Sequence, residues 1–258
     1  MKPLLIVLPS RGRPDKIKKC IDSYISTCPD DFSELSIQLD SDDKKLEEYH
    51  QVIKEYDGEK VKCEVSRRPS ENRYCITRII NRKFYRDKDR DYYCVINDDM
   101  VFETPGWDRT LAIEWAISTC KDPNMVEKHG SVVGNTPVEG FPIISVIDGR
   151  ICRALNWLQM PELDGCCGDN VWFWIGIQAR NLIYNKNVIF YHNHQAFGKS
   201  EMDDTYLPVY GNNNQGATED FKKFIDWTKY RASNQIRMVR ELIEKNIGVK
   251  NTEELCQI

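Results

Sequence analysis

Short apolar runs and longer amphipathic stretches alternate along the first hundred residues. The runs are rich in Val, Ile and Leu, a pattern typical of strands buried in a parallel sheet. They lie at residues 4–8, 36–40, 61–65 and 92–96. Apolar residues at helical spacing follow the first three runs. This repeat of strand and helix predicts an α/β protein built from βαβ units, with a mostly parallel central sheet and helices on both faces.

The pattern becomes less regular after residue 100. Apolar spacing over residues 107–120 predicts a helix that turns Leu111 and Trp115 toward the core. A further strand is expected at residues 143–147, and Asp148–Gly149 then has the composition of a hairpin turn.

The last hundred residues predict a mixture of loops, one strand and a helical tail. A Gly-rich loop spans residues 161–170 and leads into a helix, and a strand follows at 187–191. A short strand is also expected at 131–135. The polar segment 211–216 has the composition of a lid or hinge, and helical spacing resumes from Thr218.

Length and composition predict an ordinary globular protein. The 258 residues suffice for one large domain, which we place at 1–210, with a helical C-terminal extension at 211–258 packed on it. Hydrophobic residues make up 41% and charged residues 29%. A net charge of −4 argues against a generally basic nucleic-acid-binding surface, although a local basic groove is compatible with it.

Ten cysteines are present, but we expect neither a secretory signal nor a membrane span. Most of the cysteines lie within predicted strands and helices, so we expect reduced thiols in a cytoplasmic protein. Cys166–Cys167 is a vicinal pair, and the cysteine spacings offer no zinc site.

The strand at 92–96 ends on two adjacent acids, Asp98 and Asp99. Ligands of open α/β sheets bind at the carboxyl ends of the strands. Two neighbouring carboxylates there indicate a hard divalent ion, Mg²⁺ or Mn²⁺, shared with substrate phosphates. The alternative is a solvated Asp-Asp turn.

Other strand ends also carry residues suited to a nucleotide. The loop after the first strand contains Pro9, Ser10, Arg11 and Arg13 and suits an anion near a helix N-terminus, or else merely caps that helix. Asp40 could accept hydrogen bonds from a base or ribose.

Two further cations could bind a diphosphate, namely Arg73 and Lys199. The late strand runs into His192-Asn193-His194, which places two imidazoles on one side and suits metal ligation. Asp169 begins a helix and serves there either as an N-cap or as a general base.

With these features the chain resembles the GT-A glycosyltransferases, closest to a family-two-like group of small, often phage-encoded members. The resemblance rests on the segments LLIVLPSRGRP, QLDSDD, NDDMVFETPGWD, GDNVWFWIGIQAR and HNHQAFGKSEMDDTY, which lie between residues 4 and 206. It implies the GT-A nucleotide-diphospho-sugar transferase fold, with the host cytoplasm as location if the protein is viral.

The resemblance also implies roles for residues. The family's DxD motif, which binds Mn²⁺ or Mg²⁺ on the diphosphate, maps to Asn97-Asp98-Asp99, where Asn97 replaces the first acid. This mapping puts Asp99 on the metal and Asp98 toward the ribose or sugar. The family's late histidine ligand maps to His194 in preference to His192.

The implied reaction is metal-dependent hexosyl or pentosyl transfer from a nucleotide-diphosphate sugar, most of all a UDP-sugar, to an acceptor hydroxyl. The family's base-contacting acid maps to Asp40 and its catalytic base to Asp169. A divalent ion and nearby arginines would neutralise the leaving diphosphate, and a carboxylate opposite it would take the acceptor proton, giving inversion.

Two alternatives have different requirements. A sugar-nucleotide nucleotidyltransferase would need a Gly-rich, Lys-containing loop after the first strand, and residues 9–14 are poor in glycine. A non-catalytic nucleotide-sugar or carbohydrate-binding module would keep Asp40 but need neither Asp169 nor His194.

The acceptor is open between a saccharide, a lipid-linked sugar and a hydroxymethylated base in DNA. DNA would be contacted by the basic helix at 73–86 and by lysines and arginines of the C-terminal tail.

Overall fold

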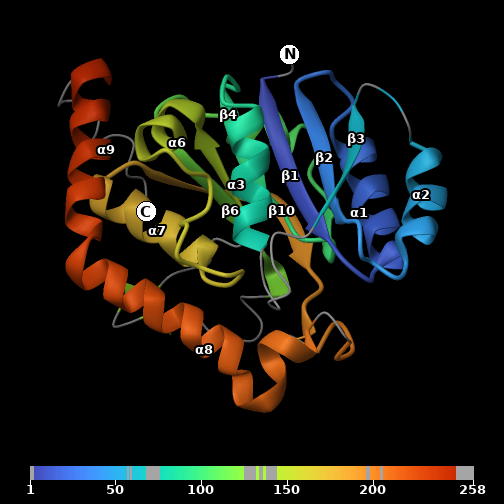
Figure 1. Cartoon of the computed structure of the whole chain (residues 1–258). Coiled ribbons are helices and arrows are strands. Elements are labelled where there is room, and N and C mark those ends of the chain that lie inside the picture. The colour runs from blue at the N-terminus through green and yellow to red at the C-terminus, as the bar shows by residue number, and fades with distance from the viewer. Residues whose placement is uncertain are drawn as a thin grey trace.

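An eight-stranded sheet lies at the centre of the computed structural model, with helices packed on both faces (Figure 1). The structure describes residues 3–56, 58, 60–67, 76–124, 132–133, 136–137, 144–195, 198–203 and 206–247. In sheet order the strands are β3 (Val61–Ser66), β2 (Ser33–Asp40), β1 (Leu4–Ser10), β4 (Tyr92–Val95), β9 (Ser145–Asp148), β6 (Ile117–Lys121), β10 (Leu182–His192) and β5 (Met100–Phe102).

The sheet is mostly parallel, as the sequence predicts. The strands β3, β2, β1, β4, β6 and β10 run in one direction, while β9 and β5 run against their neighbours. A separate antiparallel pair joins β7 (Val132–Val133) to β8 (Thr136–Pro137). The predicted strand at 131–135 thus coincides with β7, and the rest of that segment lies outside the described residues.

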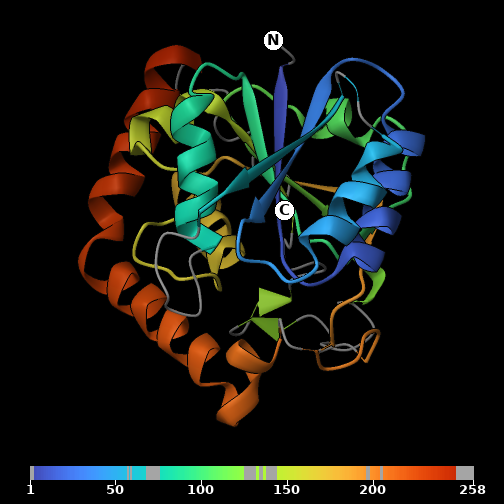
Figure 2. The same cartoon turned by 45° about the vertical axis from the view of Figure 1, so that its right-hand side comes forward.

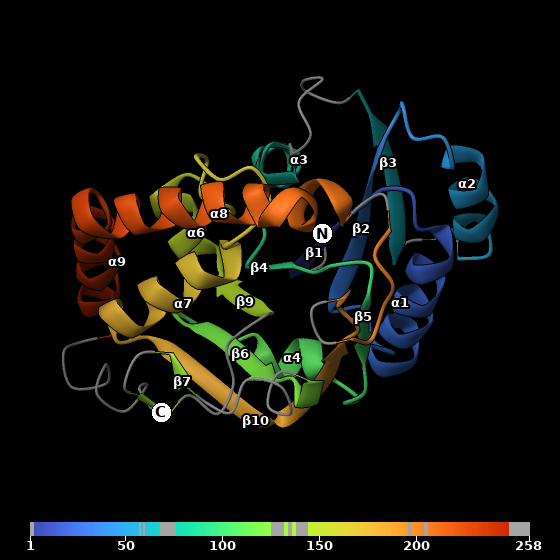
Figure 3. The ribbon, with the colours of Figure 1, turned by 90° about the horizontal axis from the view of Figure 1, so that it is seen from below.

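Two layers of helices cover the sheet (Figures 2 and 3). Their bounds are α1 (Pro14–Thr27), α2 (Leu46–Lys54), α3 (Ile76–Arg86), α4 (Trp107–Leu111), α6 (Gly149–Leu155), α7 (Gly168–Ala179), α8 (Leu207–Tyr230) and α9 (Ala232–Ile247). Side chains of β1 alternate between the layers, because successive strand residues point to opposite faces. Leu4 and Ile6 pack with α1 and α2, whereas Leu5 and Val7 pack with α3, α6, α7 and α9.

The predicted helix at 107–120 is wrong beyond its first turn. Helix α4 ends at Leu111, and Trp115 adopts a left-handed conformation with φ of 60°. Strand β6 then pairs with β9 on one side and β10 on the other. Hydrogen bonding along both edges of this segment outweighs the helical spacing of its apolar side chains. Over so short a segment, a buried strand and a buried helix have the same apolar pattern.

The predicted hairpin turn at Asp148–Gly149 and the predicted lid at 211–216 are also wrong. Asp148 caps α6, accepting a hydrogen bond of 2.8 Å from the backbone N–H of Arg150. Residues 211–216 lie within α8, whose later turns are anchored in the core by Phe224 and Trp227. Tertiary packing thus overrides the poor helix propensity of Gly and Asn.

The cysteines of the described residues are free thiols, most of them buried. Within the same residues, no helix combines the length and apolar character that a membrane crossing requires.

Candidate active site

The carboxyl ends of β1, β2 and β4 meet at one edge of the sheet. Strand β1 pairs with both neighbours, and its register sets Ser10 beside Leu39 and Val7 beside Val95. The polar residues after these strands are therefore brought together, as expected for a parallel sheet. A buried polar layer forms behind this edge and a pocket opens beside it.

Asp98 belongs to the buried layer. The Ser10 hydroxyl donates to its Oδ2 at 2.6 Å, and Nη1 of Arg13 lies 3.1 Å from its Oδ1. Burial raises the pKa of Asp98 to about 6; the charge of Asp99 adds to this effect, and Arg13 opposes it. The end of β1 and the loop after it thus bind this carboxylate directly.

Asp99 reaches its partners because β5 turns back along β10. The register sets Met100 beside His192, and Nε2 of His192 lies 3.1 Å from Oδ1 of Asp99. The hydroxyl of Tyr206 donates to Oδ2. Burial favours the neutral carboxyl, but the bonds from His192 and Tyr206 outweigh it and hold the pKa of Asp99 below its usual range. Asp99 is therefore ionised.

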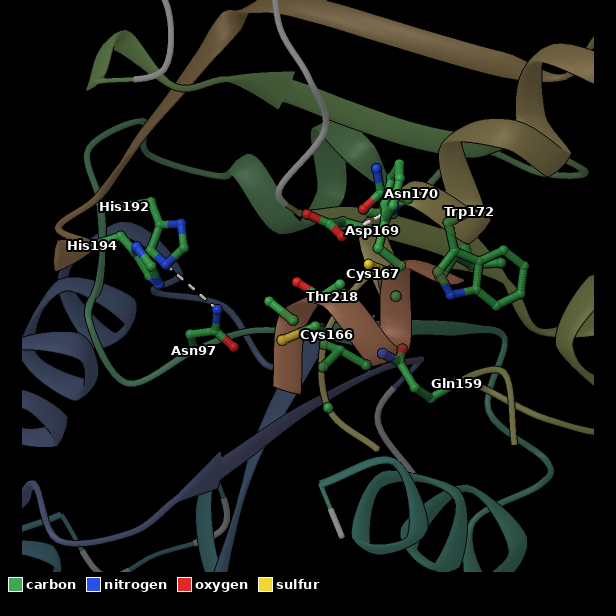
Figure 4. Close-up of a pocket in the computed structure, with 17 residues that line it drawn as sticks. Asn97, Gln159, Cys166, Cys167, Asp169, Asn170, Trp172, His192, His194 and Thr218 are labelled. Atoms are coloured by element: carbon green, nitrogen blue, oxygen red, sulfur yellow. Dashed lines mark hydrogen bonds between the residues drawn. The ribbon is translucent and has the colours of Figure 1, made fainter. Parts of the chain in front are cut away.

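His192 and His194 lie on the same side of the chain, as their spacing predicts. Their ring centroids are 5.0 Å apart, and Nδ2 of Asn97 lies 3.5 Å from Nε2 of His192 (Figure 4). Burial, together with the charge of His192, lowers the pKa of His194 to about 4. His194 is therefore neutral near pH 7, the form in which imidazole binds metals.

These side chains suit a divalent ion whose remaining ligands come from the substrate. A carboxylate oxygen of Asp99 and a ring nitrogen of His192 lie 3.1 Å apart, and both are donor types that Mn²⁺ accepts, so these two residues would hold the ion. Among the described residues no group of three or more His, Cys, Asp or Glu side chains converges on one point. The arrangement therefore suits Mg²⁺ or Mn²⁺ with few protein ligands, not a closed structural site.

A pocket of about 520 Å³ opens beside this cluster. Figure 4 shows the two histidines and Asn97 on one side of it and Asp169 on the other. Its lining includes side chains from β4 and β10 and from the segments after them, and from α7, α8 and the loop before α7: Val95, Asn97, Gln159, Cys166, Cys167, Asp169, Asn170, Trp172, His192, His194, Thr218 and Phe221.

Asp169 lies in the first turn of α7 and faces the pocket (Figure 4). Cys167, not Asp169, is the N-cap of this helix, so the capping interpretation of Asp169 is wrong. Its Oδ1 accepts a hydrogen bond of 2.9 Å from the backbone N–H of Asn170. Burial raises the pKa of Asp169 to about 6, which suits a general base near neutral pH.

The other predicted nucleotide-binding residues lie outside the pocket lining. Nη1 of Arg11 is 3.0 Å from Asp40 Oδ2 and 2.7 Å from Asp42 Oδ1, so these residues form an ion-paired group at the end of β2. Pro9 lies within β1, and Lys199 is exposed in the turn after His194. Arg73 lies outside the described residues.

Asp203 and Tyr206 were not identified as site residues from the sequence, and both contact Arg13. Arg13 donates to Asp203 from Nε at 2.9 Å and from Nη2 at 2.7 Å, and its guanidinium carbon lies 3.9 Å from the ring centroid of Tyr206. Both partners follow the histidine segment and fix it against the loop after β1. The acidic, aromatic DDTY sequence was the available signal, but nothing local shows that Asp203 and Tyr206 contact Arg13.

Comparisons with known proteins define the fold. No protein-family model matches the chain, and no curated protein matches its sequence. Similar solved structures include the mannosyltransferase PcManGT from Pyrobaculum calidifontis with GDP-Man and Mn²⁺, at 8% identity, TM-score 0.52, covering 98% of this chain and 83% of that one. S. aureus TarS 1–349 in complex with UDP is 11% identical, with TM-score 0.55, covering 97% and 77%.

A third similar structure is GalNAc-T7 with UDP, GalNAc and Mn²⁺, at 13% identity and TM-score 0.58. That match covers 94% of this chain and 54% of GalNAc-T7. At these identities the likeness establishes the architecture: the chain has the GT-A glycosyltransferase fold.

Proposed function

We propose that this protein is a metal-dependent glycosyltransferase that moves a sugar from a nucleotide-diphosphate sugar, most of all a UDP-sugar, to an acceptor hydroxyl with inversion. One observation carries the proposal. In a GT-A fold, a single pocket joins Asp169 on α7 to Asn97, His192 and His194 at the carboxyl edge of the sheet.

Asp99 and His192 would hold Mn²⁺ or Mg²⁺, with His194, the histidine favoured from the sequence, beside them. The ion, when bound, would neutralise the diphosphate as it leaves. Asp98, which Ser10 and Arg13 bind, would lie toward the ribose or sugar. Asp40, which Arg11 binds, would contact the base.

Asp169 would act as the general base. The acceptor oxygen attacks the anomeric carbon, the bond from that carbon to the diphosphate oxygen breaks, and the acceptor proton passes to Asp169. A raised pKa strengthens the carboxylate as a base while leaving it ionised at pH 7. Attack opposite the leaving group inverts the anomeric configuration.

Thermal melting against nucleotides tests the donor site. We expect UDP or a UDP-sugar to raise Tm in the presence of Mn²⁺ and to have little effect without it. At a hundredfold over Kd the added stability is about 2.7 kcal/mol. A response to GDP alone would mean that the donor is a GDP-sugar and not a UDP-sugar. No response to any nucleotide would overturn the proposal.

Donor hydrolysis separates an enzyme from a binding module. We expect slow, Mn²⁺-dependent release of UDP from the stabilising UDP-sugar in the absence of acceptor, because water can replace the acceptor hydroxyl. A protein that binds the donor but neither hydrolyses nor transfers it would be a binding module.

The prediction of a DNA acceptor gains little support from the described surface. Arg82 and Arg86 of the basic helix α3 bond to Ser66 and Glu64, and Arg231 pairs with Glu162. These intramolecular partners reduce the positive charge available to phosphates. Salt-dependent binding to duplex DNA containing hydroxymethylated bases would nevertheless support such an acceptor.

A further inference from the structure

Asp220 of α8 is a buried carboxylate that binds a loop and not another helix. Its side chain accepts hydrogen bonds from three consecutive backbone N–H groups. Asp164 donates at 3.0 and 3.1 Å, Gly165 at 2.9 Å and Cys166 at 2.8 Å. Asp220 is 2% exposed. Bonds from N–H groups to a buried carboxylate are roughly twice as strong as neutral ones.

The loop that Asp220 holds leads directly into the catalytic region. Cys167 follows Cys166 in a left-handed conformation with φ of 64°, α7 begins at Gly168, and Asp169 is the next residue. Gly168 packs against the amide end of Gln159, because a Cβ there would lie 1.8 Å from Nε2 of Gln159 and would require that side chain to move. The position of Asp169 is therefore set by the path of this loop.

Lys223, one turn further along α8, reinforces the attachment. Its Nζ lies 3.1 Å from Asp220 Oδ1 and 2.5 Å from Asp164 Oδ2. The loop is thus tied to α8 through backbone and side chain together. Thr218 and Phe221, which flank Asp220, line the same pocket as Asp169.

We propose that Asp220 is a positioning residue for catalysis, which fixes the 164–166 loop so that Asp169 faces the acceptor. This inference rests on the proposed function, in which Asp169 is the base. The donor cluster of Asp99 and His192 comes from β5 and β10, so loss of the Asp220 bonds should disturb turnover and leave donor binding intact.

The test compares Asp220→Ala and Asp220→Asn with Asp226→Asn. Asp226 is an exposed carboxylate of the same helix and serves as the matched control. Alanine removes every acceptor. Asparagine with its oxygen in the place of Oδ2 keeps the acceptor of Gly165 and Cys166, but Asp164 then loses one of its two acceptors and the NH₂ group meets the ammonium of Lys223.

Amide hydrogen exchange gives a readout that needs no ligand. We expect the amides of Asp164, Gly165 and Cys166 to exchange at least about tenfold faster in Asp220→Ala, since each loses its acceptor. Asp220→Asn should accelerate the Asp164 amide most, and Asp226→Asn none of them. Unchanged exchange in both Asp220 variants would overturn the proposal.

Kinetics separate positioning from general destabilisation. We expect Asp220→Ala to lower kcat by about a hundredfold, as a misplaced catalytic group does, with Kd for UDP in Mn²⁺ unchanged within twofold. If Asp220→Ala fails to fold, Asp220→Asn decides, with an expected loss of about tenfold in kcat. A wild-type kcat in the folded variant would overturn the proposal.

Failure of the inference and failure of the proposed function have different signatures. If Asp169→Asn is inactive while a folded Asp220 variant turns over normally, Asp220 has no positioning role and the base assignment stands. If Asp169→Asn keeps full turnover, Asp169 is not the base, and the positioning role of Asp220 is overturned with that assignment while the transferase activity stands. The proposed function itself is overturned if the wild-type chain neither binds a nucleotide nor turns over a nucleotide sugar.

Discussion

Asp169 illustrates how far a single residue can be interpreted. Its chemistry is common to all aspartates, but burial at the first turn of α7 raises its pKa to about 6 and directs it into the pocket. The sequence showed an acid after a Gly-rich loop. It did not show that Cys167 would take the capping position while Asp169 lines the pocket.

Substitution of Asp169 by Asn should separate chemistry from folding. We expect the Asp169→Asn variant to keep its Tm and its affinity for UDP with Mn²⁺, while kcat for transfer falls by about 10²- to 10⁴-fold because no base remains. Steady-state transfer assays and thermal melting measure the two effects. Wild-type turnover would remove Asp169 from the mechanism.

The pH dependence of turnover follows from the same carboxyl group. A base acts only when deprotonated, and the pKa of Asp169 is raised to about 6. We therefore expect kcat to be constant near pH 8 and to fall tenfold per pH unit well below pH 6. A profile of kcat from pH 4.5 to 8.5 measures this limb, and an inflection near pH 4 would contradict the assignment.

At the scale of elements, the site depends on segments that are far apart in the sequence. The loop after β1, the turn between β4 and β5, and the segment before α8 meet around Arg13, which contacts Asp98 and Asp203. Each contact spans more than eighty residues. Local patterns cannot specify such contacts, because they require the strand order and register of the whole sheet.

Arg13→Met should destabilise this junction. The change leaves Asp98, which is 5% exposed, without its cation, and removal of one partner of a buried pair costs about 3 kcal/mol. Urea unfolding at pH 8, where Asp98 is ionised, measures the loss. Arg109→Met is the control, because the Arg109–Asp30 pair is exposed and should contribute less than about 1 kcal/mol.

At the scale of the whole molecule, α8 and α9 belong to the core that includes β1 and α7. Trp227, Ile236, Val239 and Ile243 are buried there together with Leu5. Fully burying one such side chain contributes about 1.5–3 kcal/mol. Four of them contribute an amount comparable to the net stability of a domain, about 5–15 kcal/mol.

A chain that ends at residue 206 should therefore lose cooperative folding. We expect this truncation to bind a dye for exposed apolar surface and to lose near-ultraviolet circular dichroism, since the apolar face of α7 would be uncovered. Thermal unfolding of the two chains measures the difference. A cooperative transition in the shortened chain would show that residues before 207 fold alone.

Local sequence patterns were enough to predict the alternation of strands and helices, the mostly parallel sheet, and the positions of Asn97, Asp169 and His194 near strand or helix ends. These features are local, because apolar periodicity and the Gly or Pro residues that interrupt it are both visible within a short window of the sequence. Only the three-dimensional packing could show that residues 117–121 form a strand and that 211–216 form a helix. The same holds for the hydrogen bonds of Tyr206 to Asp99, of Arg13 to Asp203, and of the loop before α7 to Asp220. These features depend on partners distant in sequence, whose burial and hydrogen bonding outweigh local preference.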